Sequence, residues 1–216
     1  MATDAPAAAT PRGRRSSRAS GDERERAILA TAERLLGQRP LAEISVADLA
    51  EGAGISRPTF YFYFPSRDAV VLTLVERMAA EADVSRVEAL ELLREDPRTG
   101  LRQGLEAAFA AFASRRTVIL AAAELRTTNA DARQLWSRVM EGWVAQVSGI
   151  IEAERARGAA PPGPPARELA TALVQMNERA QHATLADETP ALPDGSMMDV
   201  LVEIWLRAIY GAPAQN

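Results

Sequence analysis

The 216-residue sequence predicts an all-α fold of about nine helices. Apolar residues recur every three or four positions along most of the chain, which is the periodicity of amphipathic helices. No segment shows the sustained two-residue alternation that is typical of a half-buried β-strand. Glycine and proline residues interrupt the helical pattern repeatedly, so it divides into separate helices.

The first segment, residues 1–20, has no periodic apolar pattern and is predicted to be a disordered tail. It contains four arginines, Arg12, Arg14, Arg15 and Arg18. These arginines leave two interpretations open: an arm that reaches a phosphate backbone or a minor groove, or a solvated tail kept soluble by its charge.

Three helices are predicted next, over residues 21–66. The first begins at Asp22 and stops at Gly37 and Pro40, and it has an apolar face formed by Ile28, Leu29, Ala32, Leu35 and Leu36. A short second helix follows Ser45, which forms a Ser-x-x-Asp capping box with Asp48.

A tight turn at residues 53–55 separates this second helix from a third one, which is capped by Ser56 and broken after Phe64. Two short helices joined in this way predict a helix-turn-helix, whose second helix enters the major groove of DNA. Phe60 and Phe64 are expected to pack inward. The alternative is a small core cluster that joins three helices and has no role in DNA binding.

The candidate DNA contacts lie mostly near the start of the third helix. Arg57 could bind guanine or a phosphate, and the tyrosine hydroxyls could bind sugar and phosphate. The full candidate set is Ser45, Ser56, Arg57, Pro58, Thr59, Tyr61, Tyr63 and Arg67.

The remaining residues, 67–216, are predicted to form a larger helical domain. It starts with a long fourth helix over residues 66–91, and further helices are predicted at residues 100–115, 117–126, 129–157, 166–186 and 194–210. The connections between them are rich in proline.

Composition excludes several function classes. The chain has no cysteine, so disulfides, thiolate nucleophiles and cysteine-bound zinc are impossible. We find no nucleophile–base pair, phosphate-binding glycine loop or metal-ligand spacing, and we therefore expect no enzyme, no cofactor and no metal. No apolar run is long enough to span a membrane, and the Arg14-Arg15 pair has no apolar export segment after it, so we expect a cytoplasmic protein.

The net charge is −4, which by itself does not suggest a nucleic-acid partner. Residues 1–70 hold 10 arginines against 9 acidic residues, so the candidate DNA-binding third is less acidic than the remainder. The helix-turn-helix pattern, and not the charge, therefore carries the DNA-binding prediction.

At residues 45–64 the sequence resembles the TetR family of bacterial repressors. The stretch from Ser45 to Ser56, SVADLAEGAGIS, and the following Tyr61 to Phe64, YFYF, carry this resemblance. It implies a homodimeric repressor that binds a near-palindromic operator in double-stranded DNA and is released by a small apolar effector. The sequence does not decide between repression and activation.

The resemblance is closest to one mycobacterial member of the family and runs nearly end to end, through segments such as residues 52–66, 152–161 and 176–179. It implies an apolar ligand pocket in the C-terminal domain. Trp136, Met140 and Trp143 lie on one helical face, and their spacing alone favours a place in the core, whereas the resemblance favours the pocket. His182, the only histidine, could be a pocket wall or a helix surface. The predicted pocket residues are Leu101, Gly104, Leu105, Ala108, Phe112, Trp136, Met140, Trp143, Gln146, Asn177, His182 and Trp205.

Members of the family dimerise through their last two long helices. The resemblance implies that the corresponding faces here are formed by Leu169, Leu173, Val200, Leu201, Ile204 and Ala208. A helical carrier of apolar small molecules without a DNA role is the alternative function, because it needs the pocket but not the helix-turn-helix.

Overall fold

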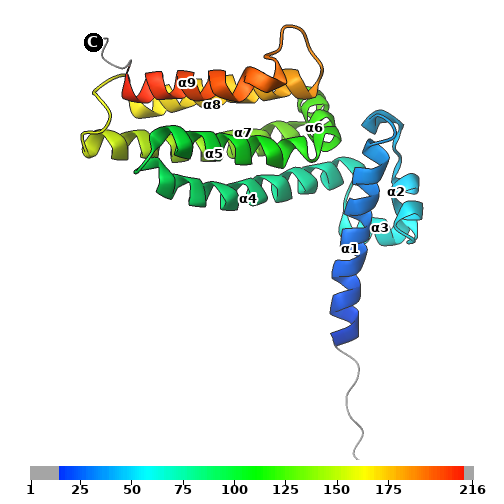
Figure 1. Cartoon of the computed structure of the whole chain (residues 1–216). Coiled ribbons are helices and arrows are strands. Elements are labelled where there is room, and N and C mark those ends of the chain that lie inside the picture. Colours follow the sequence, from blue (N-terminus) through cyan, green and yellow to red (C-terminus); the bar gives the residue numbers. More distant parts are fainter. Residues whose placement is uncertain (1–14, 212–216) are drawn as a thin grey trace, which may run out of the picture. The chain divides into compact units, whose positions relative to one another are not determined.

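The computed structural model describes residues 15–211, with side chains for residues 21–81, 92–193 and 195–211 (Figure 1). Over this range the chain forms nine α-helices and one 3-10 turn and has no strand, which confirms the predicted all-α class. The chain divides into two compact units between Val70 and Val71, within the fourth helix.

The first unit holds α1 (Arg15–Leu36), the 3-10 turn η1 (Leu41–Glu43), α2 (Val46–Gly52) and α3 (Arg57–Tyr63). Helix α1 begins seven residues before the predicted start at Asp22, so residues 15–20 are helical and were wrongly assigned to a tail. Each residue added to the end of an existing helix gains one backbone hydrogen bond for the conformational freedom that it loses. The Arg, Ser and Ala residues at this end also have helix propensities that allow the extension. Residues 1–14, with Arg12 and Arg14, lie outside the described range.

The core of the first unit is formed by large apolar side chains from each of its elements. Phe60 of α3 and Ile28 of α1 are completely buried, and Ile44 and Leu49 are almost so. Phe64 is buried as well, so both phenylalanines that were predicted to pack inward do so. The packing of Phe60 and Phe64 therefore holds α3 in place, and it leaves Tyr61 and Phe62 exposed.

The fourth helix, α4 (Arg67–Leu93), begins in the first unit and continues into the second. It is followed by α5 (Pro97–Ala113), α6 (Arg116–Thr128), α7 (Ala130–Ala156), α8 (Ala166–Leu185) and α9 (Asp194–Tyr210). Helix α7 packs along α8, and α5 packs along α9, as Figure 1 shows.

The predicted start of α5 at residue 100 is three residues too late. The Asp96 carboxylate accepts hydrogen bonds from the backbone N–H groups of Arg98 and Thr99, which caps the helix at Pro97. Proline is well suited to the first position of a helix because its missing N–H has no partner there. Pro97 therefore begins a helix, although the sequence pattern suggested that it belonged to a connection.

The core of the second unit lies between α5, α7, α8 and α9. Its most deeply buried residues are Ile151, Ala170, Leu201 and Val202. None of the helices in the described range is long and apolar enough to cross a membrane.

Candidate DNA-binding surface and ligand cavity

Helix α2 begins with a complete capping box. The Ser45 hydroxyl accepts a hydrogen bond from the Asp48 backbone N–H at 3.2 Å, and the Asp48 carboxylate accepts one from the Ser45 backbone N–H at 2.8 Å. Arg39 adds an ion pair at 3.1 Å. The hydrogen bonds from Ser45 and Arg39 lower the pKa of Asp48 to about 2, so the box is intact at neutral pH.

The turn between α2 and α3 depends on a glycine in the left-handed region. Gly54 has a φ of 67°, which costs a residue with a Cβ about 1–2 kcal/mol. The backbone N–H of Ile55 then donates to the Ala50 carbonyl at 2.9 Å, which reverses the chain direction after α2.

Helix α3 starts at the N-cap Ser56, whose hydroxyl accepts from the Thr59 backbone N–H at 3.3 Å. The Ser56 and Thr59 hydroxyls also lie 2.8 Å apart and share a hydrogen bond. The two short helices and the turn therefore form the predicted helix-turn-helix, and local hydrogen bonds fix the start of its second helix.

An exposed surface extends along α3, and we call it the α3 surface: Arg57, Pro58, Tyr61 and Phe62. Tyr61 is 50% exposed and Phe62 is 83% exposed. The Phe62 ring contacts the ring of Tyr63, with 5.2 Å between the two centroids. Tyr63 is only half-buried, in line with its candidate role. Phe62 was missed in the sequence analysis, although a helix with four consecutive aromatic residues, Phe60 to Tyr63, must expose some of them.

Arg67 has a different role from the predicted phosphate contact. One of its terminal nitrogens, Nη1, donates to the carbonyls of Leu41 and Ile44 at 2.8 Å and of Ala42 at 3.2 Å. Its Nε donates to the Asp68 carboxylate at 3.3 Å. Arg67 therefore ties the start of α4 to the carbonyls of the η1 turn and of Ile44 that follows it, and it is left out of the α3 surface.

The second unit contains an apolar cavity, which we call the main cavity. The cavity has a volume of about 110 Å³, and the open space at its mouth brings the total space not filled by protein to about 790 Å³. Five helices, α4, α5, α7, α8 and α9, contribute its walls. The lining residues are Leu93, Gly100, Leu101, Gly104, Leu105, Ala108, Phe109, Phe112, Trp143, Gln146, Val147, Ile150, Val174, Asn177, Glu178, Gln181 and Trp205.

A smaller hollow, the side hollow, adjoins the main cavity and shares part of its wall. Its lining residues are Phe112, Ile119, Ala123, Arg126, Trp136, Glu178, Gln181, His182 and Leu185.

Nine of the twelve predicted pocket residues line the main cavity: Leu101, Gly104, Leu105, Ala108, Phe112, Trp143, Gln146, Asn177 and Trp205. Three do not. Trp136 and His182 line the side hollow instead, and Met140 packs against the hydrophobic core. The α7 residues that line the main cavity are Trp143, Gln146, Val147 and Ile150. Trp136 lies two turns earlier on α7 and contacts the Phe112 ring at 6.3 Å between centroids.

Three amide side chains face the main cavity. The Trp205 indole Nε1 donates to Asn177 Oδ1 at 3.1 Å, which leaves the Asn177 amide nitrogen as a donor. Gln181 Nε2 donates to the Phe109 carbonyl at 3.2 Å, which leaves its oxygen as an acceptor. Gln146 makes no hydrogen bond within the described range. Sequence analysis missed Gln181 and Glu178 because their cavity-facing position depends on how α8 is rotated against α7.

The described residues contain no group of three or more histidine or acidic side chains that could hold a metal ion.

Sequence comparisons relate both units to known regulators. Residues 28–74 match the family described as bacterial regulatory proteins, tetR family, and residues 101–211 match the C-terminal domain of the transcriptional regulator EthR. The HTH-type transcriptional regulator EthR of Mycobacterium tuberculosis (strain ATCC 25618 / H37Rv) is 52% identical over 209 residues, which cover 94% of this chain and 95% of that protein. The predicted mycobacterial likeness is confirmed.

Solved structures show the same fold. A TetR-family regulator from Syntrophomonas wolfei superposes with a TM-score of 0.73 at 17% identity, over 91% of this chain and 100% of that one. Thermus thermophilus FadR, a TetR-family repressor in complex with lauroyl-CoA, superposes with a TM-score of 0.62 at 20% identity, over 89% of this chain and 96% of that one.

Proposed function

Since this chain belongs to the TetR family of bacterial transcriptional regulators, we propose that it is a repressor that binds a near-palindromic operator as a homodimer and is released by a small apolar effector. The observation that carries the proposal is the presence of two distinct candidate sites in one chain. The α3 surface lies in the first unit, and the main cavity lies wholly in the second.

The α3 surface suits a DNA contact. Arg57 is exposed near the start of α3, where free backbone N–H groups already favour a phosphate, and its guanidinium can bind a guanine edge through two hydrogen bonds. Tyr61 and Phe62 offer rings to sugar and base edges. Ser45, Ser56, Pro58, Thr59 and Tyr63 complete the proposed contact surface.

Dimer formation is proposed through α8 and α9. Val200 and Ile204 are 37% and 40% exposed and lie four residues apart, so they share one face of α9. Leu173 and Leu201, which were predicted for this face, are buried inside the protomer and are not part of the proposed interface. A dimer presents two recognition helices to successive major grooves, about 34 Å apart, which favours a near-palindromic operator.

The effector is proposed to occupy the main cavity. FadR is described in complex with lauroyl-CoA, a ligand with a long apolar chain, and the main cavity of this chain is lined mostly by apolar residues, with Trp143 and Trp205 in its walls. The Asn177 amide nitrogen is placed to bind a carbonyl or ether oxygen of the ligand.

Helix α4 is the proposed link between effector and DNA. It begins in the first unit, and its last residue, Leu93, lines the main cavity. Suppose that α4 adopts two positions and that the protein binds the operator in only one of them. A ligand that binds more tightly to the protein in the other position would then shift the population toward the form that does not bind the operator.

We also propose that the protein acts in the cytoplasm, where bacterial operator DNA lies, and that it is not an enzyme. The carrier alternative needs the main cavity alone and gives no reason for an exposed Phe62 on the same short helix as Arg57. Operator binding is therefore the property that separates the two functions.

The test is a titration of the purified protein against the DNA upstream of its own gene, at several salt concentrations. Tight binding that weakens steeply with salt and exceeds binding to a scrambled duplex supports the proposal, since phosphate contacts release counterions. Tyr61→Phe is expected to weaken binding about fivefold, the effect of losing about 1 kcal/mol from one hydrogen bond. Equal affinity for both duplexes would favour the carrier function.

A further inference from the structure

Two polar side chains of α8 lie at the boundary between the main cavity and the side hollow. Glu178 and Gln181 stand three residues apart on one helical face, and each lines both spaces. Every other side chain shared by the two linings is apolar, since only Phe112 joins them. A ligand whose apolar body fills the main cavity can therefore place a polar end at this boundary, in addition to any contact with Asn177.

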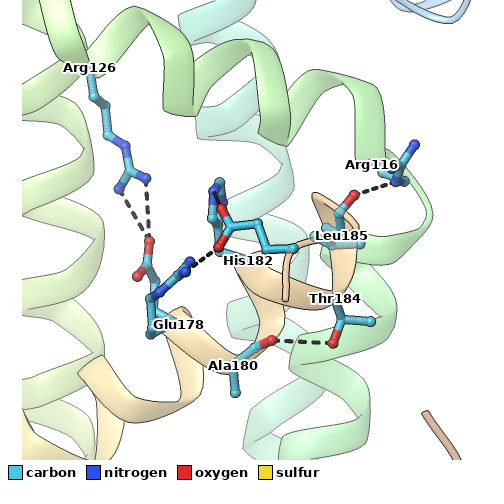
Figure 2. Close-up of polar contacts among 9 residues, drawn as sticks. Arg116, Arg126, Glu178, Ala180, His182, Thr184 and Leu185 are labelled. Atoms are coloured by element: carbon cyan, nitrogen blue, oxygen red, sulfur yellow. Dashed lines mark hydrogen bonds and ion pairs between the residues drawn. The ribbon is translucent and has the colours of Figure 1, made fainter. Parts of the chain in front are cut away.

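The Glu178 carboxylate has a free hydrogen-bonding position. Arg126 of α6 points at it, and both guanidinium nitrogens approach the same oxygen, Oε1, at 3.3 and 3.4 Å (Figure 2). The guanidinium also lies 4.5 Å from the centroid of the Trp136 ring, which holds it in place. Within the described range, the second oxygen, Oε2, accepts no hydrogen bond.

Gln181 also offers an acceptor. One of the two N–H groups of its amide donates to the Phe109 carbonyl at 3.2 Å, so the amide oxygen and the second N–H remain for a ligand. The neighbouring His182 already faces Glu188, with Nε2 3.4 Å from its carboxylate, and Arg179 pairs with the same glutamate. The groups left for a ligand at the boundary are thus two acceptor oxygens, Glu178 Oε2 and Gln181 Oε1, and one N–H of Gln181.

We infer that the effector ends in a hydrogen-bond donor, such as an amine, an amide N–H or a hydroxyl, which binds Glu178 Oε2 and Gln181 Oε1. The inference rests on the proposed function, because it assigns the chemistry of the ligand for the same cavity. A carboxylate at this end would meet the partly buried charge of Glu178, and like charges in a poorly solvated site repel strongly.

The test compares three single-chain probes of equal length, decan-1-amine, decan-1-ol and decanoate, by quenching of tryptophan fluorescence. Trp143 and Trp205 line the main cavity and report occupancy there. The amine is expected to bind at least about tenfold more tightly than decanoate, or about 1.4 kcal/mol, with the alcohol between them. Glu178→Gln is expected to weaken amine binding and to strengthen decanoate binding, because Arg126 loses its carboxylate partner.

Glu124→Gln is the matched control, since it removes the same charge from an exposed position on α6. It is expected to leave the order of the probes unchanged, which separates a local contact from attraction by the net negative charge. Thermal unfolding of each variant confirms that the fold is retained.

Decanoate binding as tight as the amine, no binding by any probe, or an amine preference that survives Glu178→Gln would each overturn the inference. The assay contains no DNA, so its result is independent of operator binding. If the protein prefers the amine but does not bind operator DNA, this inference stands and the proposed function is wrong.

Discussion

The two helices of the helix-turn-helix begin at caps formed by residues close together in the chain, whereas the main cavity is assembled from five helices spread over residues 93–205. In the first region, Ser45 bonds to Asp48 and Ser56 to Thr59, each three residues away. In the second region, the Trp205 indole reaches Asn177 and the Gln181 amide reaches Phe109, across 28 and 72 residues.

This difference has a functional consequence. A DNA-reading surface fixed by local caps keeps its geometry when the rest of the chain moves, whereas a cavity between helices changes volume when any one of them shifts. We therefore predict that substitutions in the helix-turn-helix change operator affinity, whereas substitutions in the second unit change stability or ligand response.

The largest expected effect is in the first region. Arg57→Ala removes a proposed bidentate base contact worth about 1–3 kcal/mol, and a dimer loses it twice, so operator affinity should fall at least about thirtyfold. The loss should be greatest for the preferred operator and small for random DNA. Arg133→Ala, which removes the same charge from the exposed face of α7, is the control, and an equal loss there would mean that overall charge matters and not the α3 surface.

The second prediction concerns a buried carboxylate in the second unit. Burial alone would raise the pKa of Glu154, but hydrogen bonds from Arg157 and Tyr210, the latter at 2.9 Å, outweigh burial and lower it. Tyr210→Phe should lower the free energy of unfolding by about 1.5–3 kcal/mol, the usual value for a hydrogen bond to a charged group. Operator affinity at temperatures well below unfolding should not change.

The lowered pKa of Glu154 also determines how the unfolding free energy depends on pH. Because the folded-state pKa of Glu154 lies below its unfolded value, its contribution is present above the ordinary glutamate pKa and is lost as the pH falls through the folded value. Denaturant unfolding across the acid range should show a weaker pH dependence in Tyr210→Phe than in the wild type. Identical pH profiles would contradict the assignment.

A smaller effect is expected where α4 meets α5. A Cβ at Gly100 would lie 2.6 Å from the backbone of Leu93, so Gly100→Ala must push the end of α4 away from α5. We expect a loss of about 1–3 kcal/mol in unfolding free energy, as for other overpacked sites. A Cβ at Gly149 on α7 would have no neighbouring atom within 4 Å, so Gly149→Ala should instead raise the unfolding free energy by about 0.4–1 kcal/mol. Gly149→Ala is therefore the matched control.

The smallest effect is a change of ligand response without loss of DNA binding. Ala108→Phe places a ring in the main cavity and should weaken binding of decan-1-ol about tenfold, or about 1.4 kcal/mol, while operator affinity stays the same. Tryptophan quenching and a gel-shift titration measure the two properties separately. Unchanged binding of the alcohol would place the ligand outside the main cavity.

The same contrast explains what the sequence could reveal. The capping box at Ser45, the glycine turn at Gly54 and the cap at Ser56 are local signals, and the structure contains all three. The buried phenylalanines Phe60 and Phe64 were also predicted, because helical spacing places them on one face.

Other features depend on packing and had no local signal. Arg67 donates to the carbonyls of the η1 turn across more than twenty residues, and that 3-10 turn itself was not predicted. Helical spacing placed Trp136 on one face with Trp143, and the two rings do contact each other, but Trp136 lines the side hollow and Trp143 lines the main cavity. Glu178 was missed because its exposure to the cavity follows from the rotation of α8.

The central claim is that this protein reads a specific DNA sequence as a dimer through α3, and a selection of bound duplexes from a random DNA pool tests it most directly. The account predicts enrichment of an inverted repeat whose half-sites are centred about 10 base pairs apart, or a multiple of that spacing, and its loss in Arg57→Ala. A pool that remains random after several rounds, or one enriched equally by Arg57→Ala, would contradict the account.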